Sequence, residues 1–120
     1  MVRVVRRGGI LVASEPDWGT LAIDAADRGA TREVLHALCD EHIRNGWIGR
    51  QLAGHLARAG VRAIEIHPVT LVLQSFPVAV DILGLATAGA PSWLADLRDR
   101  DEHGAFFAAM TGFTVKGRVA

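Results

Sequence analysis

A short apolar run near the start of the chain, residues 10–13, constrains the fold more than any other feature of the sequence. Two glycines, Gly8 and Gly9, precede it, and Glu15 and Pro16 follow it. Successive apolar residues without polar alternation are typical of a strand covered on both faces, as in a parallel sheet flanked by helices. The run therefore predicts a buried strand of an α/β fold.

The rest of the chain alternates between helical and strand-like patterns. Apolar residues at helical spacing predict two helices, over residues 31–43 and 47–59. A third helix is expected to begin at Pro77, because proline suits the first turn. A fourth is expected from Trp93 to about Met110, with Ser92 as its N-cap. Strand patterns cover 61–73 and 113–116, and Pro68, which cannot donate to a ladder, places the first at a sheet edge. Without a repeat or linker, residues 1–120 form one domain of about three strands and four helices.

Composition excludes several classes of function. Half of the 120 residues are hydrophobic and 22% are charged, which indicates a folded globular chain. Thirteen basic residues balance thirteen acidic ones, so neither a nucleic acid nor an anionic membrane surface is expected as a partner. The apolar runs are too short to cross a bilayer. A single cysteine excludes an internal disulfide and fits a reducing compartment, so we expect a cytoplasmic protein.

The opening segment carries a resemblance to a known family. Residues 2–16 read V-R-V-V-R-R-G-G-I-L-V-A-S-E-P, similar to the R-V-L-R/K-P-G-G-x-L-V-V-x-[ED]-P segment of class I S-adenosylmethionine-dependent methyltransferases, although Arg7 replaces the usual proline. Residues 16–20, 44–52 and 112–117 resemble a bacterial subgroup of these enzymes. The resemblance implies a partial Rossmann-like domain whose last strand is antiparallel and lies between the other two.

The resemblance covers only the C-terminal half of the family's domain. The glycine-rich turn that approaches the cofactor, and the acidic residue that binds the ribose, have no counterpart in the sequence. A truncated reading frame or a start codon assigned too late would give such a fragment. The implied function is the acceptor-side portion of an S-adenosyl-L-methionine-dependent methyltransferase acting on a small molecule. The chain alone is expected to be inactive, because nothing in it binds the cofactor.

The candidate site residues follow the strand at its C-terminal end, where open α/β sheets bind their ligands. By resemblance, Asp17, Trp18, Arg50 and Gln51 face the methyl acceptor, and Glu15 is the candidate cofactor contact. An aromatic wall at Trp18 would also favour a cationic sulfonium. The alternative is a plain turn at residues 16–19 and a solvated surface charge at Arg50. No residue is assigned a catalytic role.

One metal-like pattern is present, formed by His36, Cys39 and His42. On a helix these side chains spread over about 120°, which is wide for one ion, and zinc prefers four ligands. Because Cys39 also falls on the apolar stripe, we interpret it as a buried thiol and expect no metal site.

A half-domain leaves one strand without a neighbour, which has consequences for partners. An unpaired apolar strand invites association, so we expect a homodimer, pairing with another methyltransferase chain, or aggregation. Two alternative functions remain open. The chain could be a non-catalytic interaction module or degenerate remnant that pairs with a complete methyltransferase, or a small ligand-binding protein that uses a pocket beside Trp18.

Overall fold

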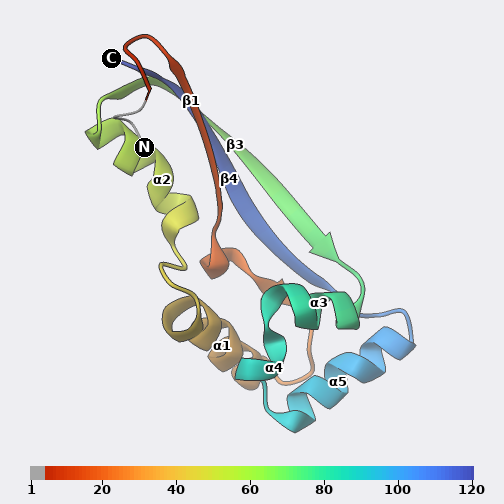
Figure 1. Ribbon diagram of the computed structural model, residues 1–120. Coiled ribbons are helices and arrows are strands. Elements are labelled where there is room, and N and C mark those ends of the chain that lie inside the picture. The colour runs from red at the N-terminus through yellow and green to blue at the C-terminus, as the bar shows by residue number, and fades with distance from the viewer. Residues whose placement is uncertain (1–4) are drawn as a thin grey trace.

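The computed structural model describes residues 5–120, so the first residues of the methyltransferase-like segment lie outside the described part (Figure 1). Four strands and five α-helices make up an α/β fold, with a 3₁₀ turn, η2, and a π turn, η3, between them. In chain order the elements are β1 (Ile10–Pro16), η2 (Trp18–Thr20), β2 (Ala22–Ile23), α1 (Arg28–Ala37), η3 (Leu38–His42), α2 (Ile48–Arg58), β3 (Val61–Leu73), α3 (Phe76–Leu83), α4 (Leu85–Ala88), α5 (Pro91–Glu102) and β4 (Ala108–Val119).

The last strand, β4, is the centre of the sheet. It pairs with β1 and the short β2 on one side and with β3 on the other, and all these pairings are antiparallel. The expectation that the final strand is antiparallel and lies between the other two is confirmed. Among the described residues there are four strands rather than about three, because β2 pairs briefly with the start of β4, and five α-helices rather than about four, because the short α4 follows α3. Pro68 lies in β3, an edge strand among the described residues, as expected.

The prediction that residues 10–13 are covered on both faces is wrong. Leu11 is buried under α2, but Ile10 and Val12, on the opposite face, are 53% and 59% exposed. Every strand pairing among the described residues is antiparallel, so the parallel sheet expected around this run is not seen. Among the described strands β1 has only β4 as a neighbour, and its outer edge is open.

The prediction of the fourth helix is wrong at both ends. The helix, α5, begins at Pro91 with Ala90 as its N-cap, so Ser92 lies inside the first turn and does not cap it. It ends at Glu102, and Gly104 follows with a φ of 68°. Met110 lies instead in β4, where it pairs with Leu71 of β3. Sheet pairing has therefore overridden an apolar spacing that also fitted a helix.

Two apolar clusters hold the fold together. The larger one lies among α1, α3, α4, α5 and the nearby end of the sheet, and consists of Leu21, Val34, Leu38, Leu73, Phe76, Ala79, Leu83, Leu85, Trp93, Leu97, Phe106 and Ala108. The smaller one lies where α2 covers the other end, and consists of Leu11, Leu52, Leu56, Val61 and Val115. The segment between these clusters carries η2, η3 and the start of α2, which form the candidate site.

The molecule is elongated, measuring 53 × 26 × 20 Å. Its radius of gyration is 17.4 Å, whereas a compact chain of this length would have about 14 Å. Figure 1 shows the reason, because β3 and β4 extend well beyond the group formed by α1, α3, α4 and α5. One face of the extended sheet, here called the open face, exposes Ile10, Val12, Val69 and Leu71. In the part of the chain that is described, no helix is long and apolar enough to cross a membrane.

Candidate functional site

The turn that leaves β1 is fixed by hydrogen bonds to β4 and to the start of α2. The backbone N–H of Asp17 donates to the carbonyl of Thr111 at 3.0 Å, and that of Trp18 donates to the carbonyl of Gly46 at 2.9 Å. The hydroxyl of Thr20 donates to the Asp17 carbonyl at 2.6 Å and accepts from the Thr111 N–H at 2.9 Å. Asp17 and Trp18 are therefore held rigidly at the C-terminal end of β1.

Asp17 is a buried carboxylate with a complete set of partners. One of its oxygens, Oδ2, accepts from Nε of Arg50 at 2.6 Å, and the other, Oδ1, accepts from the second guanidinium nitrogen at 3.0 Å. Oδ1 also accepts from the backbone N–H of Gly19 at 2.9 Å, so Asp17 caps η2. The Asp17 side chain is 1% exposed and that of Arg50 is 41% exposed. The two-pronged geometry is the strong form of an arginine–carboxylate pair.

A tryptophan holds Arg50 from a second direction. The guanidinium carbon lies 4.2 Å from the centre of the Trp47 ring, within the range of a cation–π contact. The hydrogen bonds to Asp17 raise the pKa of Arg50 further above its ordinary value, so the group is always charged. A Cβ at Gly19 would collide with Arg50 and Trp47, so only glycine leaves room for this arrangement. Arg50 is thus a preoriented side chain.

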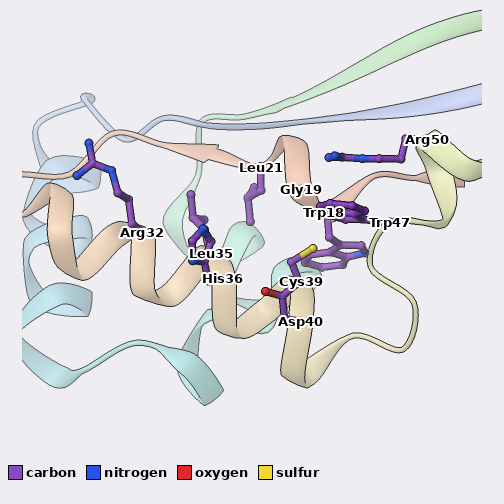
Figure 2. A pocket seen from close by; sticks show the side chains of 10 residues that line it. All are labelled: Trp18, Gly19, Leu21, Arg32, Leu35, His36, Cys39, Asp40, Trp47 and Arg50. Carbon is purple, nitrogen blue, oxygen red and sulfur yellow. The ribbon is translucent and has the colours of Figure 1, made fainter.

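Beside the pair lies a cavity of about 260 Å³, here called the tryptophan pocket. Figure 2 shows Arg50 over Trp47 at one end and Arg32 at the other, with Leu21, Leu35 and His36 between them. The lining comes from η2, α1, η3 and the start of α2, and consists of Trp18, Gly19, Leu21, Arg32, Leu35, His36, Cys39, Asp40, Trp47 and Arg50. Aromatic and apolar side chains make up about half of this lining and polar or charged ones the other half, so the pocket suits a small molecule that carries a polar group.

Cys39 is the buried thiol of this pocket. Burial raises the pKa of the Cys39 thiol above its ordinary value, and the nearby carboxylate of Asp40 raises it further. The neutral thiol therefore dominates near neutral pH, and Cys39 is a poor nucleophile. The two histidines of the metal-like pattern, His36 and His42, are both exposed. No group of three metal-ligating side chains is found within residues 5–120.

The structure brings together three of the expected site residues. Asp17, Trp18 and Arg50 meet at the tryptophan pocket, Asp17 behind its wall and the other two in its lining. Gln51 is half-buried on α2 and does not line the pocket. Glu15 is exposed in β1 and borders a shallow apolar hollow beside Val69. Gln51 and Glu15 thus lie apart from the pocket.

Sequence reasoning missed the residues that α1 and η3 contribute to the site. Arg32, His36 and Cys39 are spaced four and three residues apart, which places them on one side of a helix. That spacing was the available signal, but only His36 and Cys39 were considered, together with His42 and as metal ligands. Trp47 is 48% exposed and lines the pocket.

Comparison with known proteins gives one informative relative. No family model matches the chain. A protein of the bacterium Streptomyces fradiae, described as an uncharacterized 37.1 kDa protein in transposon TN4556, is 39% identical over 122 aligned residues. The alignment covers 94% of this chain and 35% of that protein, so the chain spans about a third of the length of its relative.

Proposed function

We propose that this chain is the acceptor-side portion of an S-adenosylmethionine-dependent methyltransferase acting on a small molecule. The observation that carries the proposal is the tryptophan pocket, which opens directly after the C-terminal end of β1 beside the Asp17–Arg50 pair. In the mostly parallel α/β sheets of the family that the sequence resembles, ligands bind at this end of the strands. The methyltransferase-like sequence through β1 and the central antiparallel position of β4 support the same proposal, which includes a Rossmann-like relationship.

The residues described here do not fit S-adenosylmethionine by themselves. The Asp17 carboxylate is 1% exposed and already accepts hydrogen bonds from Arg50 and Gly19, so it is shielded from ribose hydroxyls. Glu15, the other acidic residue near the end of β1, lies on the sheet and not beside a glycine-rich turn. The cofactor would have to be held by polypeptide outside these residues. The relative's greater length leaves room for such a segment.

The chain's own part in the reaction is therefore binding and orientation. Methyl transfer between small molecules requires alignment of the reacting atoms and exclusion of water. Trp18 and Trp47 provide apolar surface for the ligand. Arg50 is already held in place by Asp17 and Trp47, so little conformational entropy is lost when a ligand binds beside it. The Cys39 thiol is not poised as a general base, because burial raises its pKa and keeps it protonated near neutral pH.

A chimeric protein tests the proposal. This chain would replace the matched segment of the Streptomyces fradiae relative, and calorimetry would measure binding of S-adenosylhomocysteine to the chimera, to the unmodified relative and to this chain alone. We expect binding to the first two and none to the third. A folded relative and a folded chimera that both fail to bind S-adenosylhomocysteine would overturn the proposal.

A second candidate function is a non-catalytic interaction module that pairs with a complete methyltransferase. The open outer edge of β1 and the exposed side chains of the open face favour it, because such surfaces associate with other polypeptides. The two candidates differ in the tryptophan pocket. An acceptor site requires Trp18 to contact a small ligand, whereas a module predicts that replacing Trp18 leaves complex formation unchanged.

A further inference from the structure

The tryptophan pocket has a polarity that specifies a class of ligand. We propose that it binds a small aromatic monocarboxylate, with the ring against the tryptophan end and the carboxylate at Arg32. The inference rests on the proposed function in so far as this ligand would be the methyl acceptor. It is argued from the size, the walls and the charges of the pocket.

The size of the pocket suits a small ligand. At about 260 Å³ the cavity lies just below the range of roughly 300–1,000 Å³ that holds drug-sized ligands. Its walls are flat or branched apolar groups, with Trp18 and Trp47 near one end and Leu21 and Leu35 along it (Figure 2). Aromatic rings pack well against such surfaces. A single aromatic ring satisfies both conditions.

The charges differ between the two ends of the pocket. Arg50 is neutralised by Asp17 and stacked on Trp47, so it adds little net charge. Arg32 has no acidic partner among the ion pairs of the described residues, and Figure 2 shows it at the opposite end from Arg50. Arginine is well suited to a carboxylate, because its planar fork matches the two oxygens.

Two further lining residues affect the charge that the ligand can carry: His36 favours the carboxylate near Arg32, and Asp40 opposes a second anionic group. His36, four residues after Arg32 on α1, adds a second nitrogen donor on the same side of the helix. Asp40 lies on the lining beside Cys39 and would repel a second anionic group there. A monocarboxylate with its charge toward Arg32 and its ring toward the tryptophans pairs with Arg32 and places no second anionic group beside Asp40.

The experiment compares benzoate with benzamide, which has nearly the same shape and no charge, at constant ionic strength on the full chain. Binding would be followed by the three tryptophan indole N–H signals in nitrogen–proton correlation spectra. Trp93, buried and hydrogen-bonded to Thr31 at 3.0 Å, serves as the internal reference. We expect benzoate to shift the Trp18 and Trp47 signals saturably and to bind about tenfold or more tightly than benzamide, the usual effect of a charged hydrogen bond.

The matched variants are Arg32→Gln and Arg58→Gln. Both positions are exposed on helices, but Arg58 ends α2 and does not line the pocket. Arg32→Gln should reduce benzoate affinity to the level of benzamide, and Arg58→Gln should leave it unchanged. No benzoate binding, equal affinities for the two compounds, or an unaffected Arg32→Gln variant would each overturn the inference.

The outcomes separate this inference from the proposed function. If the chimera binds S-adenosylhomocysteine but the pocket does not bind benzoate, the methyltransferase proposal stands and the inferred ligand class, an aromatic monocarboxylate, is wrong. If benzoate binds through Arg32 but the folded relative and the folded chimera both fail to bind S-adenosylhomocysteine, the pocket is a ligand site of a protein that is not a methyltransferase.

Discussion

Asp17 and Arg50, 33 positions apart in the chain, join the end of β1 to the first turn of α2 through two hydrogen bonds of 2.6 and 3.0 Å. Asp17 is almost completely buried, and Arg50 supplies two of the three hydrogen bonds that its carboxylate accepts. Gly49 makes the approach possible, because a Cβ there would lie 2.8 Å from the backbone of Pro16 and Asp17. The pair therefore fixes both the backbone and one wall of the tryptophan pocket.

Removing the arginine of this pair should destabilise the protein. Arg50→Gln leaves the buried Asp17 carboxylate without its charged partner, and we expect the free energy of unfolding to fall by about 2 kcal/mol. That is less than the roughly 3–5 kcal/mol for a fully buried pair, because Arg50 is 41% exposed. Urea unfolding measures the change. Asp24→Asn, which breaks the exposed Arg100–Asp24 pair, is the control and should cost under about 1 kcal/mol. Equal costs for the two variants would contradict this account.

A methyl group at Gly19 should disturb the same site. In Gly19→Ala the new Cβ would meet the Arg50 guanidinium and the Trp47 indole, so we expect a loss of about 1–3 kcal/mol in stability and a displaced Arg50. Gly54→Ala is the matched control, because Gly54 lies in α2 with its nearest neighbour, Arg58, 3.7 Å away. That change should stabilise the helix by up to about 1 kcal/mol. Urea unfolding and the Trp47 indole signal would report both, and a neutral Gly19→Ala would refute the close packing described here.

Local sequence patterns predicted the elements that position the site but not the contact at its centre. The apolar run in β1 and the helical spacing of α2 are local features, and both elements lie close to where they were expected. Whether a strand's second face is covered depends on other parts of the fold, which is why Ile10 and Val12 were misjudged. The same holds for Met110, whose strand neighbours come from distant segments.

The candidate site was predicted residue by residue but not as an arrangement. Asp17, Trp18 and Arg50 were selected because they follow a strand or begin a helix, and because of the family resemblance. The ion pair between Asp17 and Arg50 joins residues 33 positions apart, and the periodic patterns of a single sequence do not reveal such a contact. The contribution of Arg32 likewise depends on how α1 turns toward η2, which only tertiary packing decides.

The thiol of Cys39 should make stability fall at alkaline pH. Burial raises its pKa in the folded protein above the value in the unfolded chain, so the folded state holds the proton more tightly. This contribution is complete below the ordinary thiol pKa and is lost as the pH rises through the raised folded value. Urea unfolding between about pH 7 and 10.5 should show a steeper decline for the natural protein than for Cys39→Ala. Parallel curves for the two proteins would show that Cys39 titrates normally.

The open face and the free edge of β1 should make the isolated chain associate with itself. Val12 is 59% exposed on an edge strand, and apolar edges of this kind pair with other chains. Light scattering over a dilution series should therefore give an apparent mass above that of one chain, which decreases on dilution. Val12→Lys should shift the series toward the monomer, because a charged side chain on an edge strand opposes strand addition. Ala57→Lys adds the same charge to the exposed side of α2 and should leave the association unchanged. A monomer at every concentration would show that this edge is protected in solution, and the second candidate function would then lose the observation that favours it.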